Sequence, residues 1–378
     1  MTGVGVMALE DSDRVDFTRL RLERRRRLLA AMESAGLDVL VLGRPNDVRY
    51  AAGARTLWRT GANPFAPMCV VVARTGRVHL LSTWDDGIPP EIGHDDLYGL
   101  FWNPAHLIAA LAGIPGLTEA RRVGTDSLTP FFGQVLADLI PALELVDTSG
   151  ILADVRAEKT ADELACIETA LTLAEAGLAG LDEALEPGMT EQALLGVYVE
   201  AVSRLGAPTP PSESVVFATP RQGPVRYRYL ATDRLITKGE LVVLSPGALY
   251  AGYEAGVGRT RTAGAVASVS ALALRDRCRR AVDALLAACR PGLSGADLYG
   301  AWESTGEPPA EIALAHGVGL GAESPMVGFG RGADAPLLEG AILSVQAFVS
   351  QEGTGGFFER ELVRIEDAGP VVLSRSER

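Results

Sequence analysis

Cysteine and histidine are scarce in this chain of 378 residues. There are four of each, and no two cysteines have the CxxC spacing that zinc and redox sites use. Scattered cysteines of this kind are typical of free thiols in a reducing compartment. The four are Cys69, Cys166, Cys278 and Cys289. The sequence therefore predicts buried thiols rather than disulfides.

Positive charge and long apolar runs are lacking as well. The formal net charge is −13. A surface that binds phosphate groups needs positive patches, so neither nucleic acid nor an anionic membrane is expected as a partner. Residues 1–17 contain no basic segment followed by an apolar one, and no run of 18 apolar residues follows. These absences predict a soluble, cytoplasmic protein.

The chain is long enough for two domains, and its first part alternates helix and strand signals. A helical pattern over residues 17–35 precedes a strand-like run over 37–43. Further strand signals at 68–74 and 77–83 flank a Thr-Gly turn. This alternation predicts an α/β domain over residues 1–152.

The second part, residues 153–378, contains an internal repeat. The segments EPGMTEQALLGVY and RPGLSGADLYGAW each separate one helical pattern from the next. The strand-like runs KGELVVLSPG and EGAILSVQAF follow in the same order and superpose Ser245 on Gln346. Two related halves, each with a helix pair and strands, predict a site between two sheets.

Two strand-like stretches carry residues expected to line that site. In YEAGVGRT, strand alternation places Glu254, Gly256, Gly258 and Thr260 on one face. In FFERELVRIED, the same rule groups five residues, three of them charged: Phe358, Arg360, Leu362, Arg364 and Glu366. A solvated edge strand would also explain this second pattern. His316 is the only histidine after residue 106, and its glycine-rich surroundings favour a close backbone approach to a ligand.

Three motifs resemble the pita-bread family, which contains methionine aminopeptidase, aminopeptidase P, prolidase and creatinase. They are GLDVLVLGRPNDVRYAAG, ILADVRAEKTADELACIETA and LEPGMTE, and the resemblance covers nearly the whole chain. It implies an α/β creatinase-like N-terminal domain and an α+β pita-bread C-terminal domain with an internal pseudo-two-fold duplication. It also implies a homodimer in which the N-terminal domain of one subunit lines the pocket of the other.

Active peptidases of that family bind two metal ions through two Asp, one His and two Glu. By the resemblance, these positions fall at Ser245, Gly256, His316, Gln346 and Glu366. Three carboxylates are thus replaced by residues that supply no anionic oxygen. The sequence therefore predicts neither a metal ion nor another cofactor.

The remaining side chains predict an acid–base pocket. His316 would act as a general acid or base oriented by Glu366, and Glu254 would be a second acid or a nucleophile. Arg364 would hold a substrate carboxylate, and Gln346 would orient the substrate through hydrogen bonds.

Further candidates belong to the substrate side. Ser245 leaves more space than an aspartate, and Glu323 follows the glycine run where the family has HExP. The family's substrate-side histidine falls near Arg226 or Tyr227. The implied dimer predicts a substrate gate, with an ordinary loop as the alternative. The gate residues would be Arg55, Trp58 and Arg59.

The sequence therefore favours a metal-independent enzyme that acts on a small amino-acid-like or amidine-like molecule by C–N hydrolysis or elimination. A catalytically silent homologue that binds a ligand or a protein partner is one alternative. A metallopeptidase with altered ligands is the other.

Overall fold

The computed structural model describes residues 15–54, 67–82, 87–99, 104–126, 128–140, 142–206, 214–328 and 334–378. The chain divides into two compact units between Arg156 and Ala157. The composition shift in the sequence places the domain boundary a few residues earlier, after residue 152. The two units are described separately below.

The N-terminal unit is a six-stranded mixed sheet with the order β4-β3-β2-β1-β5-β6. Its strands are β1 (Val39–Leu42), β2 (Cys69–Val72), β3 (Arg77–Leu81), β4 (Leu97–Tyr98), β5 (Arg122–Thr125) and β6 (Glu144–Asp147). Its helices are α1 (Phe17–Ser34), α2 (Pro45–Ala52), α3 (Pro104–Ala112), α4 (Pro130–Leu139) and α5 (Ser149–Ala157), with a short 3-10 turn, η2 (His94–Asp96). Apolar side chains from β1, β2 and β5 pack against α3 and α4. This unit is the α/β domain that the alternating sequence pattern predicts.

Local sequence signals set the ends of these elements. The carboxylate of Asp16 accepts a hydrogen bond from the backbone N–H of Arg19 at 2.9 Å and caps the first turn of α1. Past the end of that helix, Gly36 has a φ of 64°, a left-handed conformation that glycine adopts without a steric penalty. Gly76, with a φ of 65°, makes the turn between β2 and β3 in the same way.

The C-terminal unit contains the predicted duplication. One half has α6 (Ala161–Ala184) and α7 (Glu191–Arg204), and the other has α8 (Val269–Ala287) and α9 (Gly295–Ser304). The strands of the first half are β7 (Val215–Thr219), β8 (Leu241–Ser245), β9 (Gly247–Tyr250), β10 (Tyr253–Gly256) and β11 (Arg259–Thr262). Those of the second are β12 (Ala313–Gly319), β13 (Gly321–Gly328), β14 (Ile342–Gln351), β15 (Gly355–Arg364) and β16 (Val371–Val372). They form sheets ordered β10-β9, β11-β8-β7 and β13-β12-β14-β15-β16.

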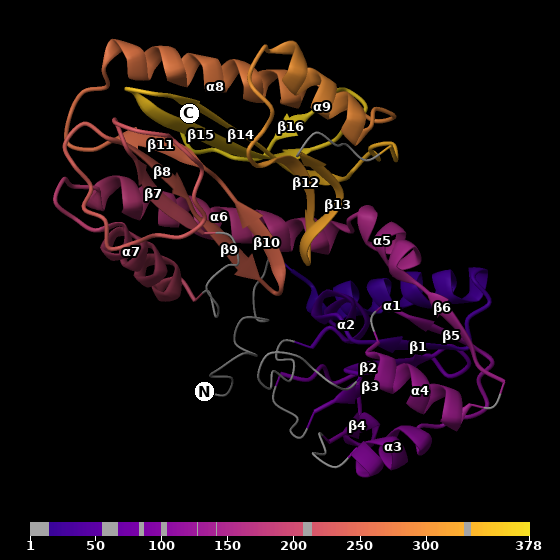
Figure 1. Ribbon diagram of the computed structural model, residues 1–378. Helices are drawn as coiled ribbons and strands as arrows, with labels where there is room; N and C mark the ends of the chain where they lie inside the picture. The colour runs from indigo at the N-terminus through magenta and orange to yellow at the C-terminus, as the bar shows by residue number, and fades with distance from the viewer. Residues whose placement is uncertain are drawn as a thin grey trace. The chain divides into compact units, whose positions relative to one another are not determined.

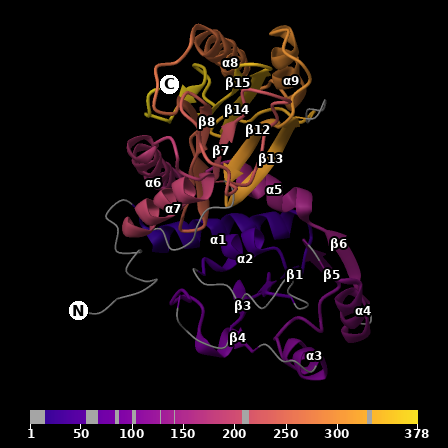
Figure 2. The same ribbon diagram turned by 60° about the vertical axis from the view of Figure 1, so that its left-hand side comes forward.

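The helices and strands of this unit form layers. In Figures 1 and 2 the strands lie between α8 and α9 on one side and α6 and α7 on the other, in agreement with the packing of α8 on β14 and β15 and of α6 on β9 and β10. An apolar core fills the space between α8, α9 and the larger sheet. A second core joins the facing sides of the two halves through β7, β8, β14 and β15. The facing sides of the sheets are called the inner faces below.

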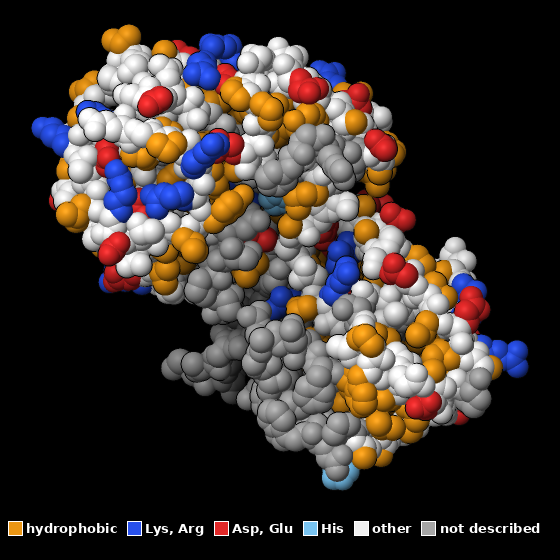
Figure 3. Space-filling view, viewed as in Figure 1, with side chains coloured by type: hydrophobic (Ala, Val, Ile, Leu, Met, Phe, Trp, Pro, Cys, Tyr) orange, Lys and Arg blue, Asp and Glu red, His pale blue; other side chains and the backbone are white. Residues whose placement is uncertain are grey.

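Helix α6 is the one described helix that is long and apolar enough to cross a membrane, with a mean hydropathy of 1.4 in its best window. Its buried residues include Cys166, Ile167 and Leu178, and it packs on β9, β10 and α7. These contacts are those of a core helix. Figure 3 shows that Lys and Arg side chains on one face of the C-terminal unit are interspersed with Asp and Glu.

Candidate functional site between the two sheets

The first half contributes positions with almost no side chain to the inner face. Ser245 ends β8 directly opposite Val215 of β7, and its side chain is buried. Gly256 ends β10 in a tight hairpin with β9, whose turn residues Ala251 and Gly252 have φ angles of 52° and 85°. Two of the positions implied by the resemblance, Ser245 and Gly256, thus contribute little or no side chain to the inner face.

The second half contributes a histidine and an amide. His316 of β12 lies opposite Ser344 of β14, and its ring is buried. Gln346 is two residues further along β14, on the same face as Ser344 by strand alternation. Its Nε2 donates a hydrogen bond to the carbonyl oxygen of Ala313 at 2.8 Å. The amide is thereby oriented by the backbone of the neighbouring strand.

A buried arginine occupies the strand position opposite this amide. Arg360 of β15 pairs directly with Gln346 and is only 2% exposed. Its Nε donates to Ser344 Oγ at 2.7 Å. Its backbone exchanges hydrogen bonds of 3.1 Å with Gly258 of the other half. Arg360 therefore stands where the two halves of the unit meet.

Glu254 shares the face of β10 that carries Gly256, by strand alternation. The side chain is 3% exposed. Burial raises the pKa of the nearby Tyr198 to about 12, and the negative charge of Glu254 contributes to that rise. Glu254 and His316 are thus two buried groups of the inner faces whose side chains are of the types used in acid–base catalysis.

The structure does not place Glu366 and Arg364 among these residues of the inner faces. Glu366 lies beyond the end of β15, and its carboxylate accepts a hydrogen bond from Arg364 Nε at 2.6 Å. Both side chains are about one-third exposed. They line a cavity of about 470 Å³ together with Lys159 and Glu339. On β15 it is Arg360, six residues earlier in the sequence, that faces Gln346.

The other substrate-side candidates lie in different surroundings and do not form one group. Glu323 of β13 forms a buried ion pair with Lys159 at 2.8 Å. Arg226 is exposed and pairs with Glu311 at 2.7 Å. Tyr227 stacks edge-on against the rings of Phe217 and Phe348, at centroid distances of 5.2 and 5.3 Å.

The predicted gate residues lie outside the described part of the chain. They are Arg55, Trp58 and Arg59.

Comparison with known proteins identifies the class and the family. Residues 165–371 match the model of metallopeptidase family M24, and residues 24–157 match the creatinase/prolidase N-terminal domain. The first match covers more than half of the chain. The chain therefore belongs to metallopeptidase family M24, a family of hydrolases. The predicted creatinase-like and pita-bread domains are confirmed.

The relatives found by sequence and by structure include Xaa-Pro dipeptidases. The Xaa-Pro dipeptidase of Pyrococcus horikoshii is 21% identical over 375 residues, which cover 94% of this chain and 98% of the relative. That of Pyrococcus furiosus is 25% identical over 60% of this chain and 66% of its own length. The crystal structure of a prolidase from Pyrococcus horikoshii superposes with a TM-score of 0.78 at 20% identity, covering 94% of this chain and 99% of that one.

These relatives contradict the function predicted from the sequence. The prediction was a metal-independent enzyme for an amino-acid-like or amidine-like molecule. The family model describes metallopeptidases, and the relatives are named for Xaa-Pro dipeptides. The prediction is therefore wrong.

The residues at the family's metal positions do not fit a pair of metal ions. Divalent ions are held by carboxylate oxygens, imidazoles or thiolates. The inner faces offer Ser245, Gly256 and Gln346 at three of these positions and His316 at a fourth, while Glu366, the fifth, lies with Arg364 in another cavity. The position opposite Gln346 carries a permanently charged guanidinium, which is only a donor. Among the described residues, no cluster of three or more His, Cys, Asp or Glu is arranged to hold a metal ion.

One contributor to the site, Arg360, was not assigned a role by the sequence argument. The match of VRIED to a family motif drew attention to Glu366 instead. The signal that could have identified Arg360 is the hairpin itself. Its turn pairs Gln351 with Gly355, and counting outward from that pair leads to Gln346 and Arg360.

Proposed function

We propose that the C-terminal unit binds short peptides of the Xaa-Pro type between its two sheets. The observation that supports this most is the combination of near full-length similarity to Xaa-Pro dipeptidases with a site on the inner faces of the same fold. Three buried polar side chains, those of Glu254, His316 and Arg360, converge on these faces from β10, β12 and β15. Buried polar groups of this kind are typical of ligand sites.

An aromatic wall beside these residues suits the proline of such a peptide. Tyr227 is half-buried and packs against Phe217, Phe348 and Phe358, at 5.4 Å from the last. Phe358 and Arg360 lie on the same face of β15 by strand alternation. A pyrrolidine ring placed against this wall would bury apolar area next to the charged part of the site.

Calorimetric titration with Leu-Pro and Pro-Leu tests the proposal. Leu-Pro is expected to bind with a Kd of about 1 mM or tighter, and Pro-Leu about tenfold more weakly. Equal binding of the two dipeptides, or no binding of Leu-Pro, would contradict it. Release of proline from Leu-Pro in the same samples, with and without Mn²⁺, distinguishes turnover from binding. The homodimer and the cytoplasmic location stay predictions of the sequence.

A further inference from the structure

Two neighbouring hollows lie along one face of helix α1. The first, of about 510 Å³, includes the capping residue Asp16 in its wall, and the second, of about 930 Å³, extends beyond the helix to Asp38. Leu22 and Arg26 line both hollows, which together form one surface, called the α1 face below. Leu22 is 52% exposed. A hollowed surface with an exposed apolar side chain and a charged rim is typical of an interface with another protein.

The larger hollow offers apolar walls. Leu37 and Val72 are buried, Leu29 is half-buried and Ala30 is exposed, and all four line this hollow. Ala30 lies on the helix itself, and its small side chain leaves room for a second helix to come close. A leucine side chain that enters the hollow would bury apolar area on both sides of the contact.

The α1 face carries opposite charges at two points of the helix. Arg26 is 72% exposed, and its contact with Glu23 is loose at 3.8 Å, because Glu23 also pairs with Arg27 at 3.4 Å. Glu33 is exposed on the same face, and no ion pair of the described residues involves its carboxylate. Arg26 and Glu33 are about two helical turns, or about 10 Å, apart along the axis. They are therefore too far apart to pair with each other within one chain.

The other acidic groups of the larger hollow already have partners. The carboxylate of Asp38 accepts hydrogen bonds from two backbone N–H groups at 2.8 and 3.0 Å. Glu119 pairs with Arg74 at 3.5 Å. Of the carboxylates described in this hollow, Glu33 is therefore the one available to a cation from another molecule.

We propose that the α1 face binds the α1 face of a second copy of this chain, with the two helices antiparallel. A two-fold axis between Leu29 and Ala30 places Arg26 opposite Glu33 of the partner subunit, and Glu33 opposite the partner's Arg26. The surface is thus complementary to itself in charge, as a two-fold interface requires.

The same charges set the register of the two helices. A shift of about two helical turns in one direction would place Arg26 opposite itself, and a shift in the other direction would place Glu33 opposite itself. Either shift brings like charges together, which is unfavourable. In the proposed register, Leu22 lies opposite Leu37 of the partner subunit and enters the larger hollow there.

This interface does not depend on the proposed peptide function. The sequence predicts a homodimer but names no pair of residues that joins the two subunits. Helix α1 has 18 residues, so its face is about 27 Å long. A contact of this extent is small for a specific complex, and a Kd of about 10 µM is expected for the dimer.

Sedimentation equilibrium of charge-reversal variants tests the ion pairs. Arg26→Glu and Glu33→Arg should each weaken the dimer about tenfold or more, because each places like charges opposite each other at two points. The double variant exchanges the charges and should return the Kd to within about threefold of the wild-type value. The matched control is Arg204→Glu on α7, which changes another exposed arginine paired with a glutamate of its own helix and should leave the Kd unchanged.

Cross-linking tests the position of the axis. The four cysteines of the chain are buried, so an added surface cysteine is the thiol that a short bismaleimide reaches first. Ala30→Cys should give a cross-linked dimer, because residue 30 lies beside the proposed axis. Ala137→Cys, at an exposed alanine of α4, is the control and should give almost none.

Three results would overturn the proposal. The first is a wild type that stays monomeric at about tenfold above the expected Kd. The second is a dimer that the single charge reversals leave unchanged, or that the double variant does not restore. The third is equal cross-linking of the two cysteine variants. A failure of Leu-Pro to bind would count against the proposed function alone.

Discussion

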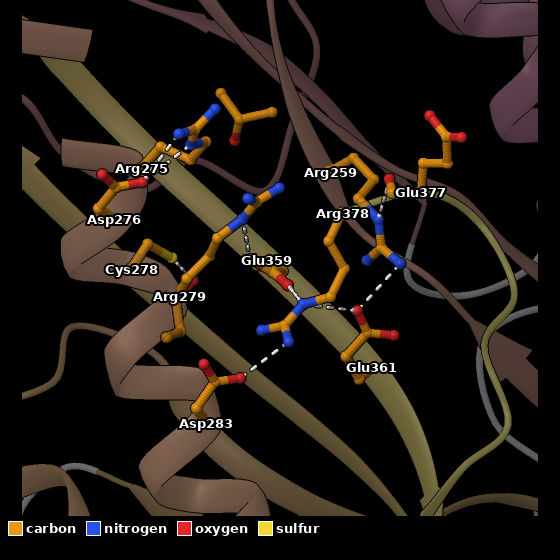
Figure 4. A network of polar contacts seen from close by, with 12 residues as sticks. Arg259, Arg275, Asp276, Cys278, Arg279, Asp283, Glu359, Glu361, Glu377 and Arg378 are labelled. Atoms are coloured by element: carbon orange, nitrogen blue, oxygen red, sulfur yellow. Dashed lines mark hydrogen bonds and ion pairs between the residues drawn. The ribbon is translucent and has the colours of Figure 1, made fainter. Parts of the chain in front are cut away.

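Strand β15 carries buried charges on both faces, and the residues around these charges differ between the two faces. On the outer face, Glu359 and Glu361 are each 1% exposed and are surrounded by arginines of the chain itself. Arg259 pairs with Glu361 at 2.9 Å, and Arg378 pairs with both glutamates. Figure 4 shows this network between β15, α8 and the end of the chain.

On the inner face, buried charged groups lie beside positions with almost no side chain. Arg360 is close to Gly256 and Gly258 and donates a hydrogen bond to Ser344 Oγ, and the buried Glu254 is on the same face of β10 as Gly256. The outer network ties β15 to α8 through Arg378, which also pairs with Asp283 at 2.8 Å. We expect changes on the outer face to reduce stability most, and changes on the inner face to alter ligand binding.

The largest effect is expected from Arg259→Met. This change leaves Glu361 buried without its closest cation and also removes hydrogen bonds to the carbonyl oxygens of Ser376 and Glu377. Breaking a buried ion pair from one side costs about 3–5 kcal/mol. Urea unfolding measures this cost. The control Arg275→Met removes a partly exposed pair with Asp276 and should cost under about 0.5 kcal/mol; similar costs for both variants would show that the outer network is not stabilising.

Gly258→Ala should have the next largest effect. The new methyl group would meet the ring of Phe358 and Cβ of Arg360, and Cβ of Arg360 cannot move without moving the backbone of β15. Overpacking of this kind costs about 1–3 kcal/mol. The matched control is Gly300→Ala in α9, where a methyl group meets nothing within 4 Å and should stabilise the helix by up to about 1 kcal/mol. Equal melting temperatures of the two variants would contradict the prediction.

Gly256→Ala should reduce stability less than Gly258→Ala does, but it should weaken ligand binding more. Its nearest neighbours are Cζ and Nη1 of Arg360 at 2.9 Å, the far end of a flexible side chain. A shift of the guanidinium relieves this contact, but the carbonyl oxygen of Pro246 at 3.1 Å is a tight backbone contact, so a cost of about 1 kcal/mol is expected. The shift of Arg360 should also weaken the binding of Leu-Pro, measured by titration. A Kd equal to that of the wild type would show that the position of Arg360 does not determine binding.

Much of the architecture follows from the sequence because it depends on local signals. Helix ends at caps and glycines and the duplicated helix pairs have sequence patterns of their own. Ser245 and Gly256 were assigned to the site by the family resemblance, and His316 by its glycine-rich surroundings as well. These features depend on short segments of sequence.

Strand register and contacts between residues far apart in the sequence could not be predicted from such local signals. The VRIED match is a local similarity, and it assigned Glu366 to a position that the β14–β15 hairpin gives to Arg360. Arg226 and Tyr227 are adjacent in sequence, yet one pairs with Glu311 on the surface and the other joins an aromatic cluster. The outer network depends on Arg378, whose contacts to Glu359 and Asp283 leave no sequence pattern.

The smallest effect expected is a pH dependence of stability. It shows whether burial or the charge of Arg259 has the larger influence on the pKa of Glu361 on the outer face. Burial raises the pKa of Glu361, and the charge of Arg259 opposes this. Because folding raises this pKa, the carboxyl group of Glu361 stays protonated in the folded chain over a pH range in which it is ionised in the unfolded chain. The free energy of unfolding of the wild type should therefore fall, relative to Glu361→Gln, as the pH rises from about 4.5, the ordinary value, through the raised one.

Urea unfolding of both proteins between pH 4 and 7 measures this difference, with Glu352→Gln in the exposed β14–β15 turn as the control for a lost carboxyl group. A difference that grows in favour of the wild type over the same range would mean that Arg259 outweighs burial. The folded chain would then favour the ionised form of Glu361, and the ion pair with Arg259 would contribute more to the stability of the outer face than the cost of burying the charge.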